Sequence, residues 1–381
     1  MRIALLGAGT VGGGVIEIVD SRVPSLEVAR ILTLPGTYDD PRVTYDFADI
    51  VSDDSIECVV EAMGGLEPAH TFIMESLAAG KHVVTANKAV VAAFLPEFCA
   101  QAERSGAGFF IEATSGGGIP WIASIVKARR IDRIDRISGI LNGTSNYIID
   151  RMVKDGAEFA DVLARAQALG YAEADPSADI DGIDVANKCI ISSTVAFGTL
   201  CRRDIPVHGI RNLTKADLDT FAGLGYAVRL MARAARDDDG YAACVEPVLL
   251  PLASVEGNVP DNFNIATLVG TTVGPLKFYG QGAGALPTGN AMVQDLIDCA
   301  GGERPAYPTG ETLAWKPGLL RADYVFRTGA ALPADTPGTA VEVAPGYVSV
   351  GGLSATEAAA LADALLAEDP ATFMAAVADV D

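Results

Sequence analysis

The glycine pattern at the start of the chain most strongly constrains what this sequence can fold into. Gly7, Gly9 and Gly12 follow a short apolar run at residues 2–6 and precede apolar residues at helical spacing. Glycines at these positions allow a tight turn and let the backbone approach a pyrophosphate, whose charge is met by the helix N-terminus. We interpret the pattern as the start of a dinucleotide-binding βαβ unit. The alternative is a tight turn in a glycine-rich chain.

Strands and helices alternate after this turn, which predicts a parallel, doubly wound sheet of the Rossmann type. From residue 134 the alternation becomes less regular, as in an α+β domain. We therefore expect an α/β chain with a dinucleotide-binding domain at residues 1–130, an α+β domain at 131–310 and a short C-terminal appendage at 311–381. The expected strands are residues 2–6, 26–34, 56–60, 81–85, 108–111, 134–141, 243–250 and 272–279, and the expected helices include 69–79, 90–105 and 355–366.

The end of the second expected strand, at Leu34, Pro35 and Gly36, carries neither of the usual cofactor-selecting side chains. An acid at this place binds the adenosine ribose of NAD, whereas an arginine nearby takes the 2′-phosphate of NADP. The choice between NAD and NADP is therefore open at this point.

The charge balance restricts the partners. The chain has 28 Lys and Arg residues against 49 Asp and Glu residues, a formal net charge of -21. Because phosphate backbones and anionic lipid surfaces bind clustered basic residues, we expect neither nucleic acid nor a membrane as a partner. No apolar stretch reaches the roughly 18 residues of a membrane span, and the first residues do not resemble a signal peptide. The six cysteines show no C-x-x-C pairing, which is typical of reduced thiols in the cytoplasm.

Two of the few lysines lie among apolar residues, where an ammonium group is costly to bury without a partner. Lys88 follows an apolar strand and so lies at the carboxyl end of that strand, where open α/β sheets bind ligands. Lys188 lies in a segment that is apolar on nearly all sides, and at helical spacing Asp181 and Asp184 share its face. We interpret both lysines as candidate acid–base groups or anion ligands. The alternative for Lys188 is an ordinary surface ion pair.

Two loops carry carboxylates of the kind that hold a cation. Glu173 and Asp179 belong to an acidic loop before the Lys188 segment, and such a loop either faces water or surrounds a substrate ammonium group. Glu112 opens a glycine-rich loop whose carboxylate and backbone carbonyls suit a hard cation. The alternative for this second loop is a flexible connection between domains.

Taken in order, these motifs resemble those of homoserine dehydrogenases from Met1 to about residue 305. The matching segments are the N-terminal glycine pattern and residues 60–69, 80–88, 112–120, 141–147, 170–188 and 280–288. The resemblance implies a reversible NAD(P)-dependent reduction of L-aspartate 4-semialdehyde to L-homoserine, on the branch that leads to threonine and methionine. It also implies a monofunctional enzyme without an aspartokinase domain, paired as a homodimer through the second domain, which is the catalytic one. The tail at residues 323–327 is similar to the start of an ACT-type regulatory module but is too short to assign one.

The resemblance further implies roles for particular residues. Lys188 corresponds to a proton donor to the aldehyde oxygen, Asp184 holds Lys188 in position, and Lys88 lies between cofactor and substrate. The implied substrate-binding residues are Glu173, Asp179, Asp184 and Lys88. The implied cofactor-binding residues are Gly7, Gly9, Thr10, Val11, Gly12, Lys88, Gly282 and Gly284, and the implied ligands of a monovalent cation such as Na⁺ are Glu112, Ser115, Gly117 and Ile119.

Two alternatives stay open beside this interpretation. One is a dinucleotide-binding sensor or inactive paralogue, and the other is a dehydrogenase for another small amino-acid aldehyde. The presence of both lysines together with the acidic loop favours an enzyme, because a protein that only binds a dinucleotide does not need them.

Overall fold

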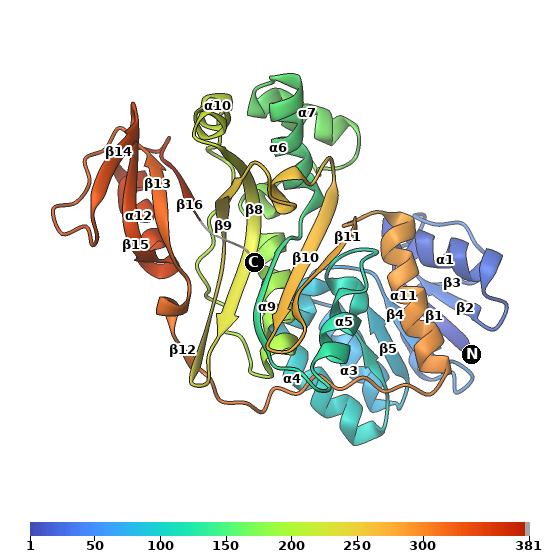
Figure 1. Ribbon diagram of the computed structural model, residues 1–381. Coiled ribbons are helices and arrows are strands. Elements are labelled where there is room, and N and C mark those ends of the chain that lie inside the picture. The colour runs from blue at the N-terminus through green and yellow to red at the C-terminus, as the bar shows by residue number, and fades with distance from the viewer. Residues whose placement is uncertain (378–381) are drawn as a thin grey trace. The chain divides into compact units, whose positions relative to one another are not determined.

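The computed structural model describes residues 1–377 and divides into two compact units (Figure 1). The first unit comprises residues 1–127 and 280–309, and the second comprises residues 128–279 and the chain from Gly310 onward. Among the described residues, no helix is both long enough and apolar enough to cross a membrane.

The first unit is a six-stranded parallel sheet in the order β3-β2-β1-β4-β5-β6, the order of a doubly wound dinucleotide-binding fold. This confirms the predicted Rossmann-type sheet. Its strands are β1 (Arg2–Leu6), β2 (Glu27–Leu32), β3 (Val43–Thr44), β4 (Cys58–Glu61), β5 (His82–Thr85) and β6 (Phe109–Phe110). Its helices are α1 (Thr10–Arg22), α2 (Ala48–Val51), α3 (Ala69–Ala78), α4 (Lys88–Ser105), α5 (Trp121–Ala128) and α11 (Ala285–Ala300).

Helix α11 belongs to the first unit, although we expected residues 280–309 within the second domain. Met292 and Leu296 of α11 are fully buried in one core with Val15 and Ile16 of α1. Because burial of this apolar face is favourable, α11 packs into the N-terminal unit although it comes late in the chain.

Helix α1 approaches α11 closely at Gly14, and a substitution at this glycine tests the packing. A Cβ on Gly14 would lie 2.1 Å from the carbonyl oxygen of Ala285, whereas a Cβ on Gly13 would meet no atom within 4 Å. We expect Gly14→Ala to reduce the free energy of unfolding by about 1–3 kcal/mol through overpacking. Gly13→Ala is the matched control and should be neutral or stabilising by up to about 1 kcal/mol. Thermal melts of the two variants check this, and equal melting temperatures would contradict the close crossing.

The second unit is a mixed sheet of ten strands with the path β11-β10-β7-β8-β9-β16-β13-β15-β14, to which β12 adds beside β9. Its strands are β7 (Ile134–Ile140), β8 (Tyr226–Arg236), β9 (Gly240–Pro251), β10 (Phe263–Gly270), β11 (Gly274–Gln281), β12 (Ala314–Trp315), β13 (Arg321–Arg327), β14 (Ala340–Ala344), β15 (Tyr347–Ser354) and β16 (Phe373–Val377). Its helices are α6 (Gly143–Asp155), α7 (Phe159–Ala168), α8 (Ser177–Ile180), α9 (Ile183–Phe197), α10 (Lys215–Gly223) and α12 (Ala355–Glu368).

The C-terminal segment that we expected to be an appendage is part of this sheet. Strand β16 pairs in parallel with β9, with Ala376 opposite Val248. Tyr324, Phe326 and Met374 are buried in the same core as Val248 of β9 and Met231 of β8. The chain from β13 to β16 therefore does not stand apart as an appendage, because its apolar face is buried against the central strands.

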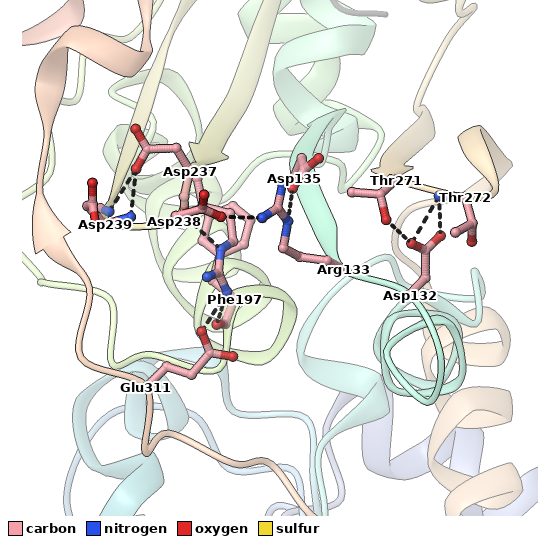
Figure 2. Close-up of polar contacts among 12 residues, drawn as sticks. Asp132, Arg133, Asp135, Phe197, Asp237, Asp238, Asp239, Thr271, Thr272 and Glu311 are labelled. Atoms are coloured by element: carbon pink, nitrogen blue, oxygen red, sulfur yellow. Dashed lines mark hydrogen bonds and ion pairs between the residues drawn. The ribbon is translucent and has the colours of Figure 1, made fainter.

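Hydrogen bonds hold the start of β7 against neighbouring turns of the second unit (Figure 2). Asp132 accepts a hydrogen bond from the Thr271 hydroxyl at 2.6 Å and others from the next two backbone amides, and these contacts hold the pKa of this carboxyl well below its usual range. Arg133 lies between Asp135 and Asp238 and pairs with both. Strand β7 then runs away from these contacts and ends at Ile140, directly before Leu141 and Asn142 of the candidate site described below.

Candidate functional site

The glycine turn of the first unit fits a dinucleotide. Gly7 has a φ of +94°, and its amide donates to the Leu32 carbonyl at 2.9 Å, so the turn lies beside the end of β2. A Cβ on Gly12 would lie 2.0 Å from the Gly7 carbonyl oxygen, so only glycine fits there. Gly9, the N-cap of α1, has no side-chain cap and no atom within 4 Å of a Cβ position. The turn thus leaves space and helix-end amides for a pyrophosphate, with Thr10 and Val11 as the first helical residues.

A buried acid joins the ends of β4 and β5 next to Lys88. Glu61 accepts hydrogen bonds from the Thr85 hydroxyl at 2.5 Å and from the Met63 amide at 2.8 Å, while burial raises the pKa of its carboxyl. Asn87 caps α4 by accepting from the Val90 amide, and Lys88 is the first residue of that helix and is half-buried. Glu61 lies in the matching segment at residues 60–69, but the sequence predicted no role for it. The sequence feature that could have indicated a role for Glu61 is an acid at the end of an apolar strand.

The side chain of Glu112 is bound by backbone amides at the N-terminus of α5. The Glu112 carboxylate accepts from the amides of Ile122 and Ala123 at 3.0 and 2.6 Å, at the N-terminus of α5. Burial raises the pKa of Glu112 to about 7. The Ser115 hydroxyl is buried and has no hydrogen-bond partner among the described residues. This orphaned oxygen is one feature that suits a cation ligand.

The structure brings the Glu112 loop together with the late glycine loop. A Cβ on Gly117 would lie 2.3 Å from the carbonyl carbon of Gly282, and the Gly118 amide donates to the Gln281 carbonyl at 3.0 Å. Gly284, with a φ of +127°, is the N-cap of α11. Ile119 is buried, and its side chain contacts the Gly280 position. These residues were predicted from separate parts of the sequence, and in the fold they are neighbours.

Lys188 lies in a buried polar cluster of the second unit. Its ammonium group donates to the Leu141 carbonyl at 2.6 Å and pairs with Asp184 at 2.8 Å, one helical turn away on α9. Lys188 is only 8% exposed and Asp184 only 7%. The pair is therefore not an ordinary surface ion pair, because its two charges are removed from water and compensate each other.

Asn142 links this pair to a second acid. Its amide nitrogen donates to Asp179 at 2.6 Å and to Asp184 at 2.9 Å, while its oxygen caps α6 by accepting from the Ser145 amide. Burial is the main cause that raises the pKa of Asp179, and the negative charge of Asp184 adds to it. The role of Asn142 was missed from the sequence, because a residue between a strand and a helix is most simply explained as a cap.

Of the other acids expected near Lys188, Glu173 has no described contact with the cluster and Asp181 pairs with another residue. Glu173 is exposed, and no described hydrogen bond joins its carboxylate to the cluster. The prediction that Asp181 shares a helical face with Lys188 is wrong, since Gly182, with a φ of +84°, separates α8 from α9. Asp181 instead forms a bidentate pair with Arg211.

Comparisons with known proteins agree with these features. The family model described as "Homoserine dehydrogenase, NAD binding domain" matches residues 7–112, and the one described as "Homoserine dehydrogenase" matches residues 120–297. A homoserine dehydrogenase of Synechocystis sp. is 42% identical over 322 residues, which cover 79% of this chain and 73% of that protein.

Solved structures show the same likeness. The crystal structure of a homoserine dehydrogenase from Thiobacillus denitrificans has a TM-score of 0.85 and 33% identity, and the match covers 100% of this chain and 99% of that one. A hyperthermophilic archaeal homoserine dehydrogenase in complex with NADPH has a TM-score of 0.68 and 25% identity over 80% of this chain and 99% of that one. With two matching family models and relatives of this identity and coverage, the chain belongs to the homoserine dehydrogenase family of NAD(P)-dependent oxidoreductases.

Proposed function

We propose that this chain catalyses the reversible reduction of L-aspartate 4-semialdehyde to L-homoserine, a step toward threonine and methionine. The observation that carries the proposal is the buried Lys188–Asp184 pair, held by the Leu141 carbonyl in a chain of this family. When bound, a reduced nicotinamide dinucleotide would supply the hydride for the reduction, and the oxidised form would accept it in the reverse direction.

In this proposal Lys188 protonates the aldehyde oxygen. An ammonium group has three N–H donors, and two are used by Leu141 and Asp184, so one is left to donate to a substrate oxygen. Asp184 positions the ammonium group through their ion pair at 2.8 Å. A fixed positive charge at a developing alkoxide lowers the barrier in both directions, first as an electrostatic stabiliser and then as the proton donor.

The acids around Lys188 suit the other end of the substrate. We assign Asp179 and Asp184, together with the exposed Glu173 of the preceding loop, to the substrate ammonium group. Asn142 holds Asp179 and Asp184 at a fixed separation by donating to both. Lys88, at the carboxyl end of β5, is assigned to substrate and cofactor binding.

The residues assigned to the cofactor are those of the glycine turn and the late loop. Gly7, Gly9, Thr10, Val11 and Gly12 would hold the pyrophosphate at the start of α1, because their backbone leaves room for it. Gly282 and Gly284 supply a second contact at the start of α11.

We further propose a monovalent cation such as Na⁺ in the Glu112 loop. The buried Ser115 hydroxyl without a described partner supports the assignment of Glu112, Ser115, Gly117 and Ile119 as ligands. A higher melting temperature in NaCl than in choline chloride at equal ionic strength is expected. No difference would contradict the cation.

A homodimer in the cytoplasm is part of the same proposal. Strand β11 lies at the edge of the second sheet, and Leu276 and Tyr279 on it expose 37% and 53% of their surface, so pairing along this edge would cover exposed apolar side chains. The six cysteines are unpaired, as is typical of a reducing compartment. Light scattering should give about twice the chain mass of 39.5 kDa, and a value near one chain would contradict the dimer.

One assay tests the function directly. Purified protein with L-homoserine and either NAD or NADP should produce reduced nicotinamide, read by its absorbance, and the reverse reaction should consume it with aspartate semialdehyde. Absence of turnover with both cofactors would reject the proposed activity in favour of a sensor or inactive paralogue. Faster turnover of a different amino alcohol would instead favour a dehydrogenase for another small amino-acid aldehyde.

A further inference from the structure

The segment that follows β2 lies where the adenosine ribose of a dinucleotide binds. The end of β2 is beside the glycine turn, because the Gly7 amide donates to the Leu32 carbonyl. In doubly wound sheets the side chains just after this strand distinguish the 2′-hydroxyl of NAD from the 2′-phosphate of NADP. The selection therefore depends on residues 33–42 of this chain.

This segment presents hydroxyl and apolar groups, and no lysine or arginine occurs from residue 33 to 41. The hydroxyls of Thr33 and Thr37 are 2.7 Å apart, and the Thr37 hydroxyl also donates to the Leu34 carbonyl at 2.7 Å. The side chain of Leu34 is 73% exposed at the tip of the turn. The turn thus has polar groups for a ribose hydroxyl and no positive charge for a phosphate.

Arg42 is the nearest arginine that follows β2, and it is held by two carboxylates. Its guanidinium donates to both oxygens of Asp40, at 2.9 and 2.8 Å, and to both oxygens of Asp20, each at 2.9 Å. Together the three groups carry a net charge of about -1 at neutral pH. Asp20 lies ten residues beyond the start of α1, about 15 Å along the helix from the glycine turn, so Arg42 is also directed away from it.

We infer that this chain prefers NAD(H) to NADP(H), and that residues 33–41 determine the preference. A 2′-phosphate would lose part of its hydration there and gain no cation, and the exposed Asp39 carboxylate would repel it. A missing charge-assisted contact of this kind corresponds to about a tenfold or larger loss of affinity.

The test measures binding without turnover, by fluorescence titration of the unliganded protein with NADH and with NADPH at equal ionic strength. We expect the Kd for NADH to be at least about tenfold lower than that for NADPH. Leu34→Arg should lower the Kd for NADPH about tenfold or more and change that for NADH little, and this gain should weaken with added salt. Leu34→Ala is the matched control and should leave the ratio of the two affinities unchanged.

Each outcome decides the inference. NADPH binding as tight as NADH binding in the unaltered protein would overturn it, and so would an unchanged NADPH affinity in Leu34→Arg. Binding of neither nucleotide would overturn the dinucleotide site together with the preference. Because homoserine is absent from the titration, a protein that prefers NADH but does not turn over homoserine would reject the proposed function and leave this inference standing.

Discussion

Lys188→Ala is expected to lower kcat by about 10²–10⁴-fold with homoserine and cofactor saturating. The substitution removes the proton donor and the positive charge that we assign to the developing alkoxide. It also leaves Asp184 without its ion-pair partner in a site where both side chains are nearly excluded from solvent. Steady-state rates measured in both directions should fall together, because the same proton is donated in reduction and accepted in oxidation.

Two controls separate this chemical role from a structural one. Lys154→Ala removes another lysine that pairs with an aspartate four residues earlier, but its side chain is 48% exposed, and kcat should stay unchanged. Small primary amines added to Lys188→Ala should restore part of the rate, which a structural defect would not allow. If Lys188→Ala kept kcat within about threefold, well short of the loss expected for a general acid, Lys188 would not be the proton donor.

Glu246→Ala is expected to reduce the free energy of unfolding by about 3–5 kcal/mol. In the second unit, Glu246 on β9 accepts from Arg233 on β8 at 2.7 Å and from the Tyr324 hydroxyl on β13 at 3.1 Å. The side chains of Arg233 and Glu246 are only 9% and 2% exposed. Without the Glu246 carboxylate, the Arg233 guanidinium and the Tyr324 hydroxyl stay buried and lose this acceptor. A buried polar group that loses its hydrogen-bond partner lowers the free energy of unfolding.

Urea denaturation of the variants measures this effect. The double variant Arg233→Met with Glu246→Leu should recover most of the loss, because apolar replacement of both partners removes the unpaired charge. Arg165→Ala breaks an ion pair with Asp155 whose side chains are 49% and 32% exposed, and it should cost less than about 1 kcal/mol. A Glu246→Ala midpoint close to that of Arg165→Ala would show that the buried network contributes little to stability.

The network also explains why the C-terminal strands were misjudged from the sequence. The alanine-rich helix expected at residues 355–366 is confirmed by α12, and residues 321–327 form β13. Nothing in a local pattern indicates that Tyr324 contacts a carboxylate 78 residues earlier, so the segment was expected to stand apart. The shared core with β9 decides otherwise.

Patterns within one element were predicted well from the sequence. The strand, glycine turn and helix at the N-terminus follow from residues 2–19, and Asp184 and Lys188 face each other because they are four residues apart on one helix. The error with Asp181 arose at a glycine, where a left-handed backbone ended one helix before the next began. Residues at helical spacing share a face only while one helix continues through all of them.

The sequence by itself therefore determined the Rossmann-type unit, the glycine turn and the Lys188–Asp184 pair, because each depends on neighbours within a few residues. Only the tertiary structure decided that the Leu141 carbonyl holds Lys188, that Asn142 joins Asp179 to Asp184, and that α11 completes the first unit. The physical reason is that these contacts join segments from 37 to more than 100 residues apart. Burial of apolar faces across the whole fold determines which distant segments come into contact. The local periodicity of the sequence does not indicate these contacts.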